Sequence, residues 1–158
     1  MPASGKSYWG KQWANELNLD FIDLDEKIES TLRKSIPEIF STSGESFFRE
    51  TESRLLSEIM HLDQFVLACG GGTPCFGDNI KWMNQFGITV FLNVGLDSMM
   101  RNIEKNNQSR PLIDGYSSHE LKVKLTQMLQ ERLPFYEQSR ITLSETELNP
   151  KALNAFVM

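Results

Sequence analysis

Residues 1–7 read MPASGKS, and Gly5, Lys6 and Ser7 fit the last three positions of the phosphate-binding pattern G-x-x-x-x-G-K-[ST]. In such a loop, glycine lets backbone amides curl around phosphate oxygens, and the N-terminus of the following helix favours negative charge. Lys6 would reach the β and γ phosphates of a nucleotide, and the Ser7 hydroxyl would bind Mg²⁺. Because GKS also occurs by chance at helix starts, the stretch predicts a phosphate site only together with the rest of the chain.

The full pattern begins with a glycine one position before Met1, and a buried strand normally precedes that glycine. We expect about eight to ten further residues upstream to supply both, because a typical strand has about five or six residues. Without that strand, its two neighbours in the sheet would keep unpaired buried backbone groups.

Working outward from this loop, short apolar runs alternate with amphipathic segments. The runs that predict strands are residues 19–24 (LDFIDL), 65–69 (FVLAC), 88–94 (ITVFLNV) and 140–143. The segments that predict helices are residues 7–18, 25–33, 37–40, 45–60, 78–86, 96–104, 119–132 and 150–157, the last with a proline in its first turn. This alternation predicts an α/β fold with helices on both faces of a parallel sheet and right-handed crossovers.

The length of 158 residues predicts one domain over residues 1–158. Hydrophobic residues make up 40% and charged residues 23%, which is typical of a globular protein and excludes disordered and collagen-like classes. The polar stretch at residues 105–118 has no apolar period and is long for a bare connector, so it is a lid candidate.

Charge and cysteine content restrict the partners. Lys plus Arg number 16 against 21 Asp plus Glu, a net charge of -5, so no global positive field attracts nucleic acid or anionic lipid. Cys69 and Cys75 form neither a disulfide framework nor a CxxC pair, which favours a reduced intracellular chain. No apolar run approaches the 18 or so residues of a membrane span, so we expect a cytoplasmic protein that binds neither nucleic acid nor membrane.

Two aspartates follow the first predicted strand in FIDLDEKIE. Asp23 and Asp25 lie two residues apart, so on an extended segment both carboxylates project to one side. They stand at the carboxyl end of the strand, where open parallel sheets bind ligands. A metal and a substrate hydroxyl would suit them, although an acidic turn that caps the next helix explains the pair equally well.

Arg49 and Glu52 lie three residues apart in FFRETE and share a helix face. They form either a surface ion pair of little energetic value, or a pair in which Glu52 orients Arg49 to grip a carboxylate at two points. The two adjacent phenylalanines, which would pack the helix beside the pocket, favour the second interpretation.

Gly70, Gly71 and Gly72 follow an apolar strand directly, and three glycines there predict that backbone amides face a bound ligand. Arg110, in RPL of the polar stretch, would bring charge to a transferring phosphate, and Arg132 ends a predicted helix. Together with the aspartates and the GKS loop, these residues predict a site that moves phosphate onto a small anionic substrate.

The ordered motifs PASGKS, FIDLD, FFRETE, GGG, RPL and RLPFY resemble the shikimate kinase family over nearly the whole chain, as far as Asn149 and Pro150. The resemblance implies a three-layer α/β/α P-loop fold with a five-stranded parallel sheet, a substrate-binding helical segment at about residues 25–55 and a lid at 105–118. It also implies transfer of the γ-phosphate of ATP to the 3-hydroxyl of shikimate with Mg²⁺, in the chorismate pathway of aromatic amino-acid biosynthesis, by a monomer.

The resemblance also implies roles for individual residues. Lys6, Asp25 and Arg110 match the catalytic group, with Asp25 at the acceptor hydroxyl. The matches for shikimate binding are Asp25, Arg49, Glu52, Gly70, Gly71, Gly72 and Arg132, and those for nucleotide binding are Ala3, Ser4, Gly5, Lys6, Ser7, Tyr8, Arg101, Arg110 and Pro150. Ser7 matches the metal ligand, and Asp23 matches the aspartate that acts on the metal through water.

Two stretches depart from the family pattern. The loop before Asn149 reads SETEL, without the usual basic residue beside adenine, so Arg101 is the remaining candidate there. The lid, EKNNQSRPL, is slightly long and rich in amides. Without the resemblance, the alternatives are a gluconate or nucleoside-monophosphate kinase, or an inactive nucleotide-binding module. An NAD site is disfavoured because GGGTP lacks the G-x-G-x-x-G spacing.

Overall fold

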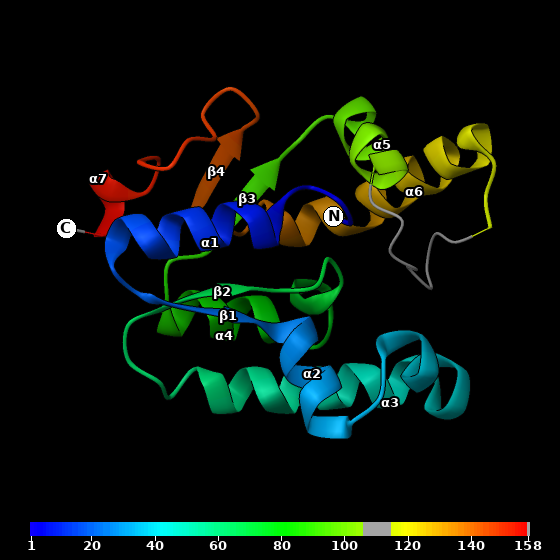
Figure 1. The fold of residues 1–158 in the computed structure, drawn as a ribbon, viewed down its shortest axis with the longest axis horizontal. Coiled ribbons are helices and arrows are strands. Elements are labelled where there is room, and N and C mark those ends of the chain that lie inside the picture. The colour runs from blue at the N-terminus through cyan, green and yellow to red at the C-terminus, as the bar shows by residue number, and fades with distance from the viewer. Residues whose placement is uncertain (106–114, 158) are drawn as a thin grey trace.

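The computed structural model describes residues 1–105 and 115–157 of the chain. The described elements, in chain order, are α1 (Lys6–Leu17), β1 (Asp20–Asp23), α2 (Leu24–Leu32), α3 (Ile36–Ile59), β2 (Phe65–Ala68), the 3-10 helix η1 (Thr73–Cys75), α4 (Asn79–Phe86), β3 (Val90–Asn93), α5 (Leu96–Lys105), α6 (Ser118–Tyr136), β4 (Ile141–Ser144) and α7 (Asn154–Val157). Figure 1 shows this order from blue to red.

The described strands form two parallel pairs. In the first pair β1 lies beside β2, with Asp20 opposite Phe65 and Asp23 opposite Ala68. In the second pair β3 lies beside β4, with Val90 opposite Ile141. All strands were expected in the sequence, and the parallel arrangement that the alternation predicted is confirmed. Each pair is a separate two-stranded sheet in the part of the chain that is described, and α1 runs between the two pairs in Figure 1.

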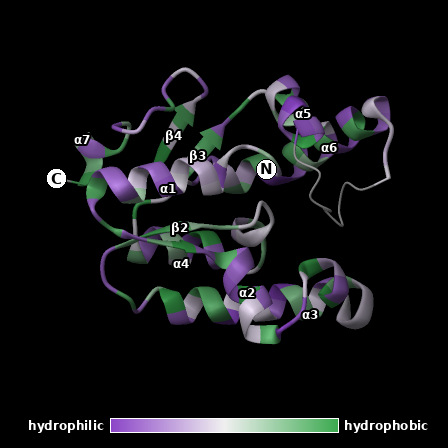
Figure 2. Ribbon diagram, in the orientation of Figure 1, coloured by the Kyte–Doolittle hydropathy of each residue, from purple (hydrophilic) through white to green (hydrophobic). Residues whose placement is uncertain are grey.

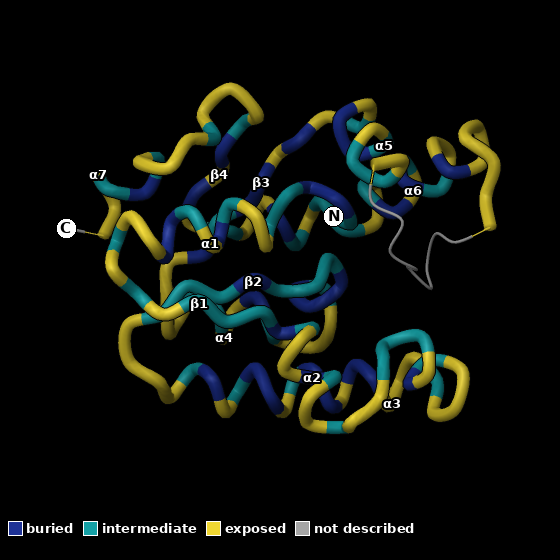
Figure 3. The backbone as a smooth tube through the Cα atoms, in the orientation of Figure 1, coloured by how far each residue is buried: buried dark blue, intermediate teal, exposed yellow. Residues whose placement is uncertain are grey.

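Two hydrophobic clusters hold these layers together. One joins α1, the β3–β4 pair, α5 and α6, and its buried residues include Trp13, Phe91, Leu125 and Leu143. The other packs α2 against α3 behind β1 and β2 around Leu24, Ile28, Ile39, Phe48, Leu55 and Leu56. Figure 2 shows hydrophobic residues on β3, β4 and the second part of α3, and Figure 3 shows buried residues in the same elements.

The two helices predicted at residues 37–40 and 45–60 lie within α3, which is interrupted at Gly44. This glycine has φ 81° and ψ 171°, so the chain kinks there before continuing as a helix. The first part begins at a capping box. The Ser35 hydroxyl accepts a hydrogen bond from the Glu38 amide, and the Glu38 carboxylate accepts one from the Ser35 amide. The kink turns the second part, which carries the predicted arginine and glutamate, along the β1–β2 pair (Figure 1).

Two helix boundaries were predicted wrongly. The helix expected to end at Arg132 continues through Pro134 to Tyr136, because Leu133 and Tyr136 pack into the hydrophobic cluster around β3 and β4. That burial outweighs the cost of about 3 kcal/mol for an interior proline. The helix expected from Pro150 begins only at Asn154, since residues 149–154 form turns closed by the Ala152 to Asn149 and Asn154 to Lys151 backbone bonds.

The expected lid at residues 105–118 falls largely on residues 106–114, outside the described part of the chain. Its flanks are the end of α5 at Lys105 and the start of α6 at Ser118, where Ser117 forms a second capping box with Glu120. No described helix combines the length and apolar character needed to cross a membrane.

Candidate active site

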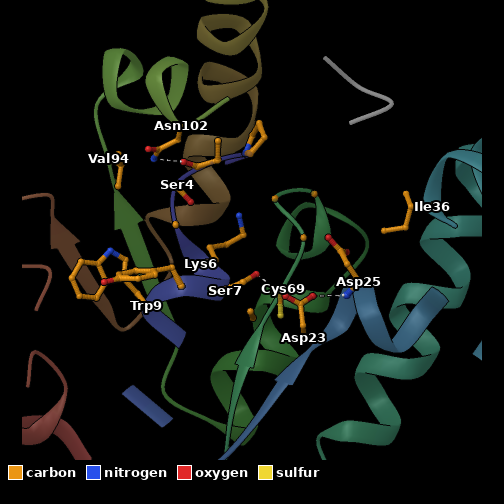
Figure 4. A pocket seen from close by; sticks show the side chains of 18 of the residues that line it. Ser4, Lys6, Ser7, Trp9, Asp23, Asp25, Ile36, Cys69, Val94 and Asn102 are labelled. Atoms are coloured by element: carbon orange, nitrogen blue, oxygen red, sulfur yellow. Dashed lines mark hydrogen bonds between the residues drawn. The ribbon is translucent and has the colours of Figure 1, made fainter. Parts of the chain in front are cut away.

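A cavity of about 1250 Å³ lies where the carboxyl ends of the strands meet the N-terminus of α1. Each strand contributes to its wall at or just beyond its carboxyl end, through Asp23, Ala68, Val94 and Glu145. This is the edge at which open parallel sheets bind ligands. Both strand pairs therefore face one site, and Figure 4 shows it from close by.

The loop ahead of α1 has the shape expected of a phosphate-binding loop. Gly5 adopts φ 85°, which glycine reaches without strain, and its carbonyl accepts the amide of Trp9 to start the helix. Lys6 Nζ donates to the backbone oxygen of Met1 at 2.6 Å, across the mouth of the loop. Asn102 on α5 donates to the Ala3 carbonyl at 2.9 Å and holds the loop from the other side. The predicted nucleotide-binding residues of this segment, Ala3, Ser4, Gly5, Lys6, Ser7 and Tyr8, all line the cavity.

Ser7 and Asp23 meet at the base of this loop. The Ser7 hydroxyl donates to Asp23 Oδ2 at 2.6 Å, while Asp23 Oδ1 accepts the amide of Asp25 at 3.0 Å and caps α2. The capping interpretation holds for Asp23, because one of its oxygens caps α2, while the other accepts from Ser7 in the loop (Figure 4). A hydroxyl and a carboxylate placed together offer the hard oxygen atoms that Mg²⁺ prefers.

Asp25 follows in the first turn of α2 and lines the cavity. Burial first, and then the negative charges of Asp23 and Glu52, raise the pKa of its carboxyl to about 6, against the opposing pull of Lys6 and Arg49. A carboxylate with this pKa is ionised at neutral pH yet accepts a proton readily, which suits a general base.

Arg49 and Glu52 form a buried pair, so their interpretation as a surface ion pair is wrong. Arg49 is 8% exposed and Glu52 is 0% exposed, and Nη1 of Arg49 lies 2.8 Å from Oε2 of Glu52. Glu45 adds a longer contact to Arg49 at 3.4 Å, and the guanidinium also lies 5.0 Å from the centre of the Phe48 ring. The guanidinium is thus fixed from three sides at the cavity wall.

The three glycines after β2 line the same wall, and two of them leave room for arginines. A Cβ on Gly72 would lie 2.4 Å from Nη2 of Arg49, and a Cβ on Gly71 would lie 3.1 Å from Nη1 of Arg132. Any side chain at residue 72 would displace the Arg49 guanidinium. The turn, Gly70 included, therefore brings the guanidiniums of α3 and α6 close to the backbone at one end of the cavity.

Tyr136, at the end of α6, was missed by sequence reasoning. Its hydroxyl donates to the Gly71 carbonyl at 2.6 Å, and its ring stacks on Phe91 with centroids 5.0 Å apart. Burial raises the pKa of this phenol to about 12, so it stays a hydrogen-bond donor. The one sequence signal for this contact with the glycine turn is that Tyr136 lies one helical turn after Arg132 in RLPFY.

Residues of α5 and of the segment after β4 form another side of the cavity. Arg101 lines it and donates to Ser98 at 2.6 Å, and Ser98 in turn donates to Glu145 at 2.5 Å. Leu148 also lines this side, whereas Pro150, predicted at the nucleotide, does not line the cavity and lies in the turns after β4. Arg110 falls outside the described residues.

Comparisons with known proteins identify a consistent set of relatives. The sequence model of the family described as shikimate kinase matches residues 2–157. Shikimate kinase of Bacteroides thetaiotaomicron is 40% identical over 148 residues, which are 94% of this chain and 85% of the relative. That of Clostridium botulinum strain Loch Maree is 34% identical over 147 residues, covering 92% and 84%.

Solved structures agree with these sequence relatives. A crystal structure of the Bacteroides thetaiotaomicron shikimate kinase superimposes with a TM-score of 0.88 at 41% identity, covering 93% of this chain and 84% of that one. The structure of shikimate kinase from Acinetobacter baumannii in complex with shikimate gives a TM-score of 0.81 at 32% identity, covering 90% and 78%.

Proposed function

The chain belongs to the shikimate kinase family, and we propose how its own residues carry out the reaction. It is an ATP-dependent phosphotransferase that converts shikimate to shikimate 3-phosphate and releases ADP, in aromatic amino-acid biosynthesis. The observation that carries the assignment of roles is the buried Arg49–Glu52 pair beside Arg132 and Asp25 in one cavity with the phosphate-binding loop. Two guanidiniums and a carboxylate fit an acceptor that bears a carboxylate and hydroxyl groups.

The loop ahead of α1 binds the ATP phosphates in this proposal. Its amides and Lys6 hold the β and γ phosphates, and Tyr8 and Arg101 line the approach to them. Mg²⁺ bound with ATP neutralises charge between the phosphates, and Ser7, with Asp23 through water, would hold it. The distance of 2.6 Å between the Ser7 hydroxyl and Asp23 supports this donor set. A nucleotide contact by Pro150 is proposed from the family resemblance alone.

Arg49 and Arg132 hold the shikimate carboxylate at the glycine turn. Glu52 keeps the Arg49 guanidinium in plane, and the backbone of residues 70–72 completes the wall. Asp25 then accepts the proton of the 3-hydroxyl as that oxygen attacks the γ-phosphorus, and the bond from phosphorus to the β-phosphate oxygen breaks to release ADP. Its pKa of about 6 supports this role.

From the family resemblance we also propose that Arg110, in the lid at residues 105–118, brings positive charge to the transferring phosphate. We also propose that the two parallel pairs belong to one five-stranded sheet. The meeting of both pairs at one cavity supports this arrangement. We further propose that the chain is a single domain and acts as a cytoplasmic monomer.

ADP release from Mg·ATP, measured with and without shikimate, tests this function. We expect ADP release to depend on shikimate and to stop when the metal is chelated. Arg49→Ala should raise the KM for shikimate by about 30-fold or more, because it removes a charge-assisted contact and leaves Glu52 buried without it. Arg54→Ala is the matched control, since Arg54 lies on the same helix, is exposed and pairs only with Glu58 among the ion pairs described. Equal effects of the two substitutions would contradict the assignment.

A further inference from the structure

Thr73 is a fully buried polar residue that the proposed mechanism does not use. It begins η1 directly after the glycine turn and is 0% exposed. Its hydroxyl donates to Glu52 Oε1 at 2.6 Å, while the other oxygen of Glu52 accepts from Arg49 at 2.8 Å. Thr73 does not line the cavity, so its hydroxyl reaches the substrate site only through Glu52.

The backbone of Thr73 is anchored as well as its hydroxyl. Asn79, at the start of α4, donates its side-chain amide to the Thr73 carbonyl at 2.9 Å. The side-chain oxygen Oδ1 of Asn79 accepts from the hydroxyl of Ser53 at 3.1 Å, and Ser53 follows Glu52 on α3. Hydrogen bonds thus run from α3 to η1, on to α4, and back to α3.

The glycine turn leaves room for this network. A Cβ on Gly70 would lie 3.0 Å from Glu52 Oε1 and 3.2 Å from the Thr73 hydroxyl oxygen. Either atom would have to give way, so a side chain at residue 70 would press on the Thr73–Glu52 hydrogen bond. The absence of a side chain at Gly72 therefore leaves space for the Arg49 guanidinium. The absence of one at Gly70 leaves space for the hydrogen bond between Thr73 and Glu52.

A carboxylate with no exposed surface needs a partner on each oxygen, because an unpaired buried polar atom costs roughly 1–3 kcal/mol. Arg49 satisfies one oxygen of Glu52 and Thr73 satisfies the other. Loss of the Thr73 hydroxyl would leave Oε1 of Glu52 without this donor, and the guanidinium would lose part of the support that sets its plane. A two-point grip on a carboxylate depends on that plane.

We propose that Thr73 is a positioning residue for acceptor recognition, whose hydroxyl fixes Glu52 and thereby holds Arg49 in the orientation that binds the shikimate carboxylate. This inference rests on the proposed role of Arg49. It assigns Thr73 no contact with substrate, and it predicts effects on shikimate that the nucleotide does not share.

The test compares Thr73→Val, which keeps the shape and removes the donor, with Thr73→Ser, which keeps the donor. Thr73→Val should raise the KM for shikimate about tenfold while the KM for ATP stays within about twofold. Thr73→Ser should stay within about threefold of the wild type for shikimate. Thr31→Val is the matched control, because the Thr31 hydroxyl is exposed and bonds the Lys27 carbonyl of its own helix.

A double-mutant cycle shows whether Thr73 acts through Arg49. In the Arg49→Ala background, Thr73→Val should change the KM for shikimate by no more than about twofold, because the residue it positions is gone. An undiminished tenfold effect in that background, or a proportional rise of both KM values in Thr73→Val alone, would overturn the inference. If Arg49→Ala alone leaves the KM for shikimate unchanged, the proposed function fails instead, so the two failures are distinguishable.

If Thr73→Val does not fold, Asn79→Ala provides the test. It removes the anchor of the Thr73 backbone and leaves the hydroxyl in place. We expect a rise of about threefold in the KM for shikimate, with the KM for ATP unchanged. No difference from the wild type, or an equal change for both substrates, would contradict the positioning role.

Discussion

The two ends of the cavity are built differently. At the acceptor end Glu52 and Thr73 have no exposed surface, Arg49 has little, and a chain of hydrogen bonds joins all three. At the nucleotide end the loop offers backbone amides, and the side chains that follow it are exposed at Ser7 and at Tyr8, which is 62% exposed. In the function we propose, the acceptor meets charged groups that are fixed in advance, whereas the ATP phosphates meet a helix N-terminus whose geometry comes from the backbone.

The comparison predicts that substitutions at the acceptor end change shikimate kinetics and leave ATP binding nearly intact. Asp25→Asn should show the largest effect. We expect kcat to fall by about 100-fold or more, because the variant cannot accept the hydroxyl proton, with the KM for ATP within about threefold. Steady-state kinetics with each substrate varied in turn checks this result. A small loss of kcat would show that Asp25 only positions the acceptor.

Arg132→Ala should show the next largest effect. We expect the KM for shikimate to rise about 30-fold and the KM for ATP to change far less, because Arg132 lies against the glycine turn at the acceptor end. Calorimetric titration with each ligand gives the same comparison without turnover. Equal losses of shikimate and ATP affinity would remove the distinction between the two ends.

The pH dependence of kcat/KM for shikimate should show a smaller effect. The pKa of Asp25 is raised to about 6, so its carboxylate predominates above that pH and is lost below it. The value of kcat/KM should therefore fall about tenfold for each pH unit below 6 and be level from about pH 7 to 8. In Asp25→Asn this acid limb should disappear. A limb that persists in the variant would assign the titration to another group.

Much of the fold could be predicted because its strands are short apolar runs separated by amphipathic helices. Candidate site residues could be named where motif residues stand at strand ends, as with Asp23 and Asp25. Burial could not be predicted in the same way, since the three-residue spacing of Arg49 and Glu52 is shared by surface pairs. Only the packing of α3 onto β1 and β2 decides between these environments.

Residues that act through distant partners gave no signal in the sequence. Thr73 bonds Glu52, which lies 21 residues earlier, and a lone threonine after glycines belongs to no periodic pattern. Tyr136 was hidden for another reason. The proline at 134 indicated the end of a helix, and the stacking of Tyr136 on Phe91, which helps carry α6 past it, involves a strand far away in the sequence.

The most direct test of the account is the preference for shikimate over its methyl ester, measured as the ratio of kcat/KM values in the wild type and in Arg49→Ala. The ester keeps the ring and hydroxyls but lacks the carboxylate charge. We predict that the wild type prefers shikimate by about 30-fold or more, and that this preference is smaller by a factor of about ten in Arg49→Ala. The same preference in both proteins would contradict the claim that the buried arginine at the acceptor end recognises the carboxylate.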